Sequence, residues 1–298
     1  MIIGSRGSQL ALWQSELVKT MLSETGIVAK IEIIKTTGDK IDNLSFDKIE
    51  GKGFFTKELE DALLDSRIDM AVHSLKDLPT EFPPGLSLGA YCAPEDPSEL
   101  LLIHTDKFDP ENKLGLVEKT VVGTSSVRRE AQINYLRKDI TIKPLRGNVP
   151  TRIKKLRDGM YDAIVIAHAG VKRLDLDLSY LKSVVLKRSE LLPAPGQGIL
   201  AIEIRSGDNK TAEAVKPLND HIAQQRALLE RGLLAKMQGG CQLPLAVNSE
   251  ITDGEYKLQA FLGRQSDGEW IEPLLYSGND KDMEKLIDSA FKYLSSAD

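Results

Sequence analysis

Cysteine is almost missing from this chain of 298 residues, which contains only Cys92 and Cys241. Two cysteines cannot form a disulfide framework, and they leave no cysteine-rich zinc or iron–sulfur pattern. The four histidines are widely dispersed, so the sequence offers no spacing that would ligate a metal. We therefore predict a protein of a reducing compartment that holds no metal ion.

Long apolar runs and targeting features are also missing. The longest apolar candidates, around 163–167, have the length of a strand, whereas a membrane span needs about 18 residues or more. The N-terminus lacks the basic region and apolar stretch of a secretory signal. With 41% hydrophobic and 28% charged residues, the composition is typical of a globular protein. We expect a soluble, cytoplasmic protein.

The net charge of −5 argues against a generic nucleic-acid binder. Positive charge is nevertheless concentrated in one segment, because residues 124–157 contain ten lysines and arginines but only two acids, Glu130 and Asp139. Such a focused positive field favours a polyanionic ligand. A solvated basic surface explains the same count, so charge alone leaves both interpretations open.

The chain is longer than one core usually fills, and two or three domains are expected. Hydrophobic spacing predicts helices at 10–21, 53–64, 127–137 and 151–157, and strands at 1–5, 31–37, 69–74, 120–123, 141–144 and 163–167. Such alternation predicts parallel sheets covered by helices. Five prolines between 79 and 97 interrupt it, as a domain boundary would. A strand at 199–204 could return to the first sheet and make the first domain discontinuous.

From residue 216 onward the pattern changes to a small α+β domain. A helix is expected at 218–236, and strands follow that are joined by two hairpin turns, Asp253-Gly254 and Asp267-Gly268. A last helix is expected at 280–294. We predict domain 1 at 1–92 plus 191–212, domain 2 at 96–188 and domain 3 at 216–298.

Two predicted turns between a strand and a helix carry arginines. The first, 123–129, ends in Arg128 and Arg129, and the second, 145–152, contains Arg146 and Arg152. Both are expected where open α/β sheets bind ligands, beside helix N-termini whose N–H groups attract anions. Arginines in a first turn oppose the helix dipole, which an anionic ligand would explain, although arginines at exposed helix starts are common. No phosphate-binding motif is present, so carboxylates are at least as plausible as phosphates.

Asp77 and Cys241 are the other residues with chemical potential. Asp77 follows the predicted strand at 69–74, where it could act as a general acid, a counter-ion or a cap. Cys241 follows two glycines in a turn after a helix, and such an accessible cysteine is a nucleophile or an attachment point. Cys92 is predicted to be buried and inert. The segment 51–55 is either a mobile loop or an ordinary approach to a helix.

Seven segments, in this order along nearly the whole chain, resemble the porphobilinogen deaminase family. They are Ser5–Gln14, Gly51–Glu60, Ala71–Asp77, Gly123–Arg129, Leu145–Val149, Pro193–Gly198 and Gly239–Pro244. The resemblance implies an α/β fold of three domains: two like the halves of type II periplasmic binding proteins, with mixed, mostly parallel sheets, and a small α+β third domain. It implies a transferase that joins four porphobilinogen molecules head to tail, with release of ammonia, to give the linear tetrapyrrole hydroxymethylbilane.

The resemblance also implies a dipyrromethane cofactor, attached through a thioether to Cys241. Its matching positions give a catalytic set of Asp77, Lys76, Arg6 and Phe55. The cofactor-binding set is Cys241, Lys76, Asp77, Thr124, Ser125, Ser126, Arg128, Arg129, Arg146 and Gly147. The substrate-binding set is Arg6, Ser8, Lys52, Ser74, Arg146, Arg152, Arg173 and Gln197. Gly7, His168 and Gly232 depart from the family pattern, and none of them removes a proposed functional residue.

The expected partners are few: porphobilinogen as substrate, transient contact with uroporphyrinogen-III synthase when the product is passed on, no nucleic acid and no membrane. The resemblance favours a monomer. Two other functions fit parts of the sequence. A ligand-sensing regulator with the same two-lobed architecture would explain the arginines, but it would leave Asp77 and Cys241 without a role. A family member that binds tetrapyrroles without turnover would not need Asp77.

Overall fold

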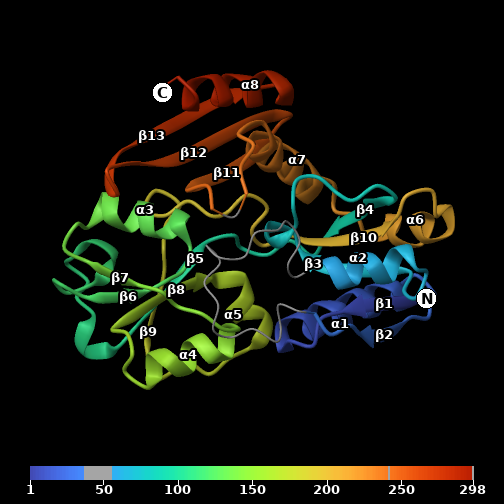
Figure 1. Ribbon diagram of the computed structural model, residues 1–298, viewed down its shortest axis with the longest axis horizontal. Coiled ribbons are helices and arrows are strands. Elements are labelled where there is room, and N and C mark those ends of the chain that lie inside the picture. Colours follow the sequence, from blue (N-terminus) through green and yellow to red (C-terminus); the bar gives the residue numbers. More distant parts are fainter. Residues whose placement is uncertain (37–55, 241, 297–298) are drawn as a thin grey trace. The chain divides into compact units, whose positions relative to one another are not determined.

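The structure is a computed structural model that describes residues 1–36, 56–240 and 242–296 (Figure 1). The chain forms two compact units. The first comprises residues 1–95 and 198–225, and the second comprises residues 96–197 and 226–298. The chain therefore leaves the first unit and returns to it. The limits of the three domains given above remain a prediction.

A five-stranded sheet is the centre of the first unit. Its spatial order is β2 (Lys30–Ile33), β1 (Ile2–Ser5), β3 (Met70–Ser74), β10 (Leu200–Arg205) and β4 (Leu86–Cys92). The first three strands are parallel, and β10 is antiparallel to both of its neighbours. The predicted return of the strand near 199–204 to the first sheet is thus confirmed.

Successive side chains of a strand point to opposite faces of the sheet. Both faces of this sheet carry apolar residues, and helices cover both. Val18 and Leu22 of α1 (Gln9–Glu24) pack in one apolar cluster with Met70 and Val72. On the other face, α2 (Lys57–Leu64) packs around Ala71. Cys92 is fully buried in the α1 cluster, as predicted. Two further helices of the chain are α6 (Asn209–Val215) and α7 (His221–Lys236).

The second unit contains a five-stranded sheet with the same pattern of directions. Its order is β7 (Thr141–Lys143), β6 (Val121–Gly123), β8 (Ala163–Ala167), β5 (Glu99–Ile103) and β9 (Lys182–Val185). The first three strands are again parallel, and β5 is antiparallel to its neighbours. Ile133 of α3 (Val127–Leu136) packs on one face. Residues of α4 (Val149–Arg157) and α5 (His168–Leu174) pack on the other.

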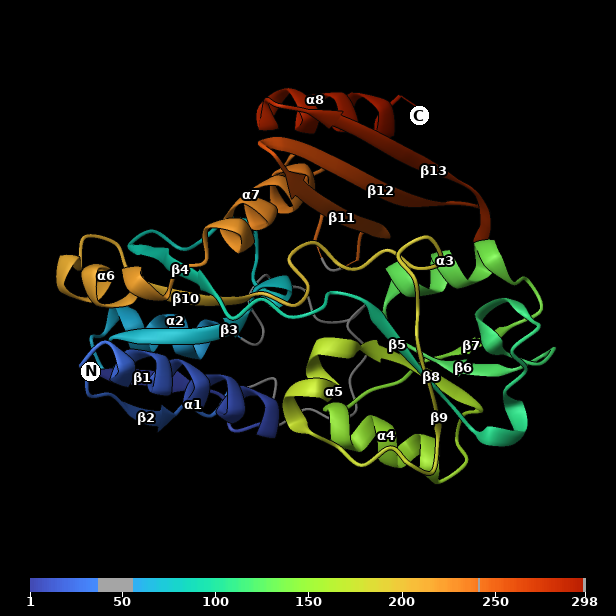
Figure 2. The same cartoon turned by 180° about the vertical axis from the view of Figure 1, so that it is seen from behind.

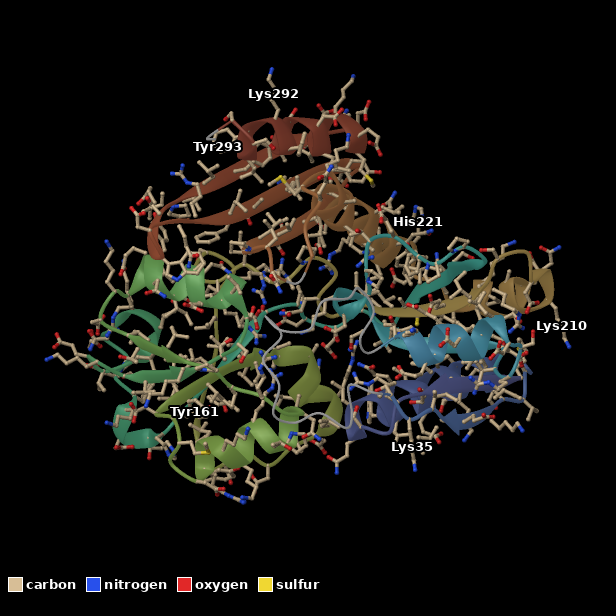
Figure 3. All side chains as sticks on the ribbon, in the orientation of Figure 1. Lys35, Tyr161, Lys210, His221, Lys292 and Tyr293 are labelled. Carbon is tan, nitrogen blue, oxygen red and sulfur yellow. The ribbon has the colours of Figure 1, made fainter. Side chains whose placement is uncertain are left out.

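Close packing at the centre of this sheet depends on Gly123. A Cβ atom there would lie 2.7 Å from the ring of Tyr161, whose hydroxyl donates a hydrogen bond to the Pro144 carbonyl at 2.5 Å. The Tyr161 side chain is labelled in Figure 3. The glycine therefore lets the aromatic ring cross the end of β6, where the predicted arginine turn begins.

A three-stranded antiparallel sheet forms the C-terminal part: β11 (Leu245–Thr252), β12 (Glu255–Ser266) and β13 (Glu269–Asp280). Its turns use Asp253-Gly254 and Asp267-Gly268, and all four residues have positive φ, as two-residue hairpins require. Helix α8 (Met283–Leu294) lies along one face (Figure 2). The opposite face places Phe261 against Ala131 of α3.

These sheets confirm the predicted α/β architecture of mixed, mostly parallel sheets with a small α+β C-terminal part. In each five-stranded sheet four strands run in one direction, and β10 or β5 runs against them. The strands β4, β5 and β9 were not predicted; prolines lie on both sides of β4 and just before β5, where they interrupt the hydrophobic pattern.

Candidate functional site

Asp77 lies on a short 3-10 turn, Leu75–Asp77, that directly follows β3. We call this segment the Asp77 turn. Leu75 is fully buried, and its backbone N–H donates to the Ile199 carbonyl at 3.0 Å. The Asp77 side chain is exposed, and within the described part of the chain its carboxylate accepts no hydrogen bond. The turn is thus anchored while its carboxylate faces solvent, which argues against Asp77 acting as a cap.

Several predicted residues share this edge of the first sheet. Arg6 follows β1, which runs parallel to β3, so both strands end at the same edge. Ser74 is the last residue of β3, and its hydroxyl accepts a hydrogen bond from Gln14 at 2.9 Å. Ser8 accepts a hydrogen bond from the Ala11 N–H at 3.3 Å and so caps α1. Arg6 and Lys76 are half-buried.

Three hydroxyl groups organise the turn between β6 and α3 in the second unit. Thr124 accepts a hydrogen bond from the Ser126 N–H at 3.1 Å, and Ser126 caps α3. Ser125 Oγ donates to the Leu145 carbonyl and accepts from the Leu145 N–H, both at 3.0 Å. The hydroxyl of Ser125 therefore joins the two arginine-bearing turns predicted from the sequence.

Arg128 and Arg129 are buried and share one carboxylate. Each guanidinium donates to an oxygen of Glu99 at 2.6 Å, and the Glu99 side chain is fully buried. Arg128 also donates to the Leu192 carbonyl, and Arg129 to the Val165 carbonyl. Burial lowers the pKa of Arg128, and the Glu99 carboxylate opposes that shift.

This network gives the arginine pair a structural counter-ion that sequence reasoning missed. The available signal was weak: one acid begins an otherwise apolar strand, Glu99–Ile103. Nε of Arg129 is buried and has no hydrogen-bond partner among the residues that the structure describes. Within the described residues, the terminal nitrogens of the pair thus bond to Glu99 and to two backbone carbonyls, while Nε of Arg129 has no partner.

The second arginine turn is built around Gly147. Its φ of +109° suits glycine, and a Cβ atom there would lie 2.7 Å from the Thr151 methyl group. Arg152 Nε donates to the Gly147 carbonyl at 2.7 Å, and Lys155 donates to the Arg146 carbonyl at 3.0 Å. Arg146 and Arg152 are both half-buried.

Two predicted substrate contacts occupy buried positions. Arg173 lies on α5 and is 7% exposed. Gln197 is also buried, and its side chain donates to the Pro97 carbonyl at 2.6 Å. Gln197 thereby ties together the two segments at which the chain enters and leaves the sheet of the second unit.

Cys241, Lys52 and Phe55 lie outside the described residues. The two glycines before Cys241 differ in their surroundings. A Cβ atom on Gly239 would lie 2.4 Å from Leu243, whereas a Cβ atom on Gly240 would have nothing within 4 Å. A side chain at Gly239 would thus collide with Leu243, whereas among the described residues nothing would contact a Cβ atom at Gly240.

Glu230 is a second buried carboxylate that the sequence did not reveal. Its oxygens accept hydrogen bonds from the Gly196 N–H at 2.7 Å and from the Ser249 hydroxyl at 2.7 Å. Burial raises its pKa, which Arg226 opposes. It joins α7 both to the segment 193–198 and to β11.

The three departures from the family pattern have local consequences. Gly7 is exposed, and a Cβ atom there would make only an ordinary contact with Ile33 at 3.6 Å. His168 pairs with Asp96 at 3.3 Å. Gly232 lets α8 approach α7, because a Cβ atom there would lie 2.7 Å from Ile287.

Residues 1–36, 56–240 and 242–296 contain neither a metal-ligating cluster nor a membrane-spanning helix. No group of three or more His, Cys, Asp or Glu side chains is arranged there to hold a metal ion. In the same residues, no helix combines the length and apolar character that crossing a membrane requires.

The sequence is similar to proteins of one family along almost its whole length. Residues 1–213 match the family model described as "Porphobilinogen deaminase, dipyromethane cofactor binding domain", and residues 224–286 match "Porphobilinogen deaminase, C-terminal domain". A porphobilinogen deaminase of Sulfurimonas denitrificans is 44% identical over 88% of this chain and 83% of that protein. One from a Nitratiruptor species is 40% identical over 98% of this chain and 94% of that protein.

Similar solved structures come from solute-binding proteins. An ancestral cationic amino acid solute-binding protein matches with a TM-score of 0.41 and 14% identity, over 80% of this chain and 93% of that chain. A Salmonella typhimurium periplasmic binding protein with high arginine specificity matches with a TM-score of 0.42 and 10% identity, over 75% and 93% of the two chains.

Proposed function

This chain belongs to the porphobilinogen deaminase family, and from that starting point we propose the role of its own residues in the reaction. The reaction of the family joins four porphobilinogen molecules head to tail, releases ammonia at each addition and yields hydroxymethylbilane. We propose Asp77 as the catalytic carboxylate, the arginines as holders of the substrate carboxylates, and Cys241 as the point of cofactor attachment.

The observation that carries this proposal is the Asp77 turn, whose exposed carboxylate accepts no hydrogen bond within the described residues and lies at the sheet edge where Arg6 follows β1. Ammonia leaves porphobilinogen with the electron pair of its carbon–nitrogen bond, and the remaining cation is attacked by a pyrrole carbon, which then loses its proton. A fixed carboxylate beside the pyrrole N–H groups stabilises the positive charge and can accept that proton. We propose that Asp77 does both.

The arginines suit the acetate and propionate groups of porphobilinogen. A hydrogen bond to a charged group contributes roughly 1.5–3 kcal/mol, so several guanidinium groups can hold a flexible polycarboxylate. We propose Arg6, Arg146, Arg152 and Arg173 for the substrate, together with Ser8, Ser74, Lys52 and Gln197. Phe55 and Lys76 complete the catalytic set.

The dipyrromethane cofactor fits the residues that are present. Within the described residues the buried Nε of Arg129 has no hydrogen-bond partner, and we propose it as a donor for one of the cofactor's carboxylates. The cofactor supplies the primer to which the first porphobilinogen is joined. We propose that Cys241 holds it through a thioether, and that Lys76, Asp77, Thr124, Ser125, Ser126, Arg128, Arg129, Arg146 and Gly147 surround it.

We further propose three domains within the limits predicted from the sequence, a monomer in the cytoplasm, and transient contact with uroporphyrinogen-III synthase. Neither a nucleic acid nor a membrane is among the proposed partners. The segments near Cys92 and Leu191, where the chain passes between its units, are proposed as hinges that make room for a growing product.

Replacing Asp77 by Ala tests the proposed function. We expect hydroxymethylbilane formation to fall by at least about 100-fold, which is the usual size of a general acid–base contribution. The unfolding temperature should change little, because the side chain is exposed. Ammonia release from porphobilinogen measures the reaction directly. Turnover at the wild-type rate in this variant would contradict the assignment.

A further inference from the structure

Glu203 is a buried carboxylate that no step of the proposed reaction uses. It lies on β10, is fully buried, and its Oε2 accepts a hydrogen bond from His73 Nε2 at 3.0 Å. Its other oxygen, Oε1, has no hydrogen-bond partner in the part of the chain that the structure describes. His73 is the fourth residue of β3, so only one residue separates it from the Asp77 turn.

The strand register explains why these two side chains meet. Ala201 pairs with His73, and Glu203 pairs with Ala71, so His73 and Glu203 are diagonal neighbours on one face of the sheet. It is the face on which Ala71 packs against α2. The hydrogen bond between them is therefore a cross-strand link between β3 and β10.

Two backbone contacts continue this link toward the Asp77 turn. Ser74 pairs with Leu200, and the Leu75 N–H donates to the Ile199 carbonyl at 3.0 Å. The start of β10 is thus joined to the end of β3 and to the turn by successive contacts. Leu75 is fully buried and Asp77 is exposed. The position of the Asp77 carboxylate therefore depends on how firmly the end of β3 and Leu75 are held against β10.

Stability alone does not account for a buried carboxylate with so few partners. Burying a polar group is costly unless it is hydrogen-bonded, and replacing a buried polar pair by apolar side chains of similar volume is often neutral or stabilising. A buried polar atom without a partner therefore needs another explanation. Apolar packing has no preferred direction, whereas a hydrogen bond does. The bond between His73 and Glu203 can therefore fix the angle between β3 and β10 just before the Asp77 turn.

We propose that His73 and Glu203 are positioning residues that hold the Asp77 turn against the start of β10. Their hydrogen bond keeps the Asp77 carboxylate at one place while pyrrole units are added. The inference rests on the role proposed above for Asp77, and it extends the machinery of that site to a pair that need not touch the substrate.

The test replaces the pair by apolar side chains in the double variant His73→Leu/Glu203→Met. This exchange avoids leaving either polar group buried alone, so the protein is expected to fold and to unfold near the wild-type temperature. A misplacement of about 1 Å can cost on the order of 100-fold in rate. We expect kcat for ammonia release to fall by about 30-fold or more, with KM changed by less than about threefold, because the proposed arginine contacts are intact.

A conservative variant and a packing control accompany this test. Glu203→Gln keeps an oxygen that can accept the His73 hydrogen bond, and its kcat should stay within about threefold of wild type. Ile204→Val removes a methylene from the opposite face of β10, where Ile204 is 4% exposed and packs in the α1 cluster. It should lower the unfolding temperature without lowering kcat. An apolar pair that folds and turns over at the wild-type rate would overturn the inference, and so would a Glu203→Gln variant as slow as the apolar pair.

Combination with Asp77→Ala separates this inference from the proposed function. If the pair acts through Asp77, adding His73→Leu/Glu203→Met to Asp77→Ala should slow the reaction no further, because effects of coupled residues are not additive. Additive losses would show an independent effect and overturn the positioning role alone. Full turnover by Asp77→Ala itself would instead contradict the function proposed for that residue.

Discussion

At the scale of single residues, this protein combines buried carboxylates with an exposed one. Asp77 is exposed on an anchored turn, whereas Glu99, Glu203 and Glu230 are fully buried among specific donors. A buried carboxylate is costly unless it is hydrogen-bonded, so each of the three organises the backbone or the cations around it. Of these four carboxylates, Asp77 is the one that we propose to interact with a ligand.

Glu60 gives a prediction at this scale. The side chain is 7% exposed on α2, and burial together with the charge of Glu203 raises its pKa, against hydrogen bonding from Thr56. A carboxyl group whose pKa is raised in the folded state binds more protons there than in the unfolded state. Stability therefore falls as pH rises from the ordinary pKa through the folded pKa, and the penalty is complete above the folded value.

Replacing Glu60 by Gln should remove this penalty. We expect the unfolding temperature of Glu60→Gln to exceed that of wild type at pH 7, and the difference to shrink as pH is lowered toward 4.5. Thermal unfolding at several pH values measures this. Glu213→Gln, which alters an exposed glutamate, is the control. A difference that grows toward acid pH would contradict the predicted sign.

At the scale of elements, Glu99 joins β5 to the first turn of α3 through both arginines. Replacing Glu99 by Gln leaves two buried guanidinium groups without their counter-ion. Removing one partner of a buried ionic pair costs about 3–5 kcal/mol, and we expect a loss of that size in the free energy of unfolding. Denaturant unfolding measures it.

The exposed pair Arg188–Glu250, at 3.2 Å, is the matched control. Glu250→Gln should cost less than about 1 kcal/mol, because exposed ionic pairs contribute little. If both variants lost the same small amount, Glu99 would not be the counter-ion that holds α3 in place.

The helices and strands also show which parts of the fold could be predicted from the sequence. The strand at 163–167 and the helix beginning at Val127 follow directly from periodicity, and the hairpins follow from Asp-Gly pairs at positive φ. Strand β4 was not predicted because prolines precede it and because apolar and polar residues do not alternate regularly along it. The glutamates at 99 and 203 were missed for another reason: each is a lone acid whose partners are distant along the chain. Glu230 has Arg226 four residues before it, but its hydrogen-bond donors, Gly196 and Ser249, are also distant in sequence.

At the scale of the whole molecule, the chain passes from one unit to the other and back. In each five-stranded sheet, the fourth strand is β10 or β5, and each of these follows a passage of the chain from the other unit. Strand β10 begins beside the Asp77 turn, and the segment before it is held by Glu230. The proposed catalytic carboxylate, Asp77, and the proposed cofactor residue, Cys241, belong to different units of the chain.

The most direct test of the account is the intact mass of the purified protein after incubation with porphobilinogen, compared with Cys241→Ser. We predict that the wild-type chain exceeds its sequence mass by at least two linked pyrrole units, and that the variant does not. This result would establish the covalent attachment at Cys241 from which chain growth begins. If neither protein exceeded its own sequence mass, or if both showed the same excess, the result would contradict the account. An absence of any excess would favour a protein that binds anions without turnover.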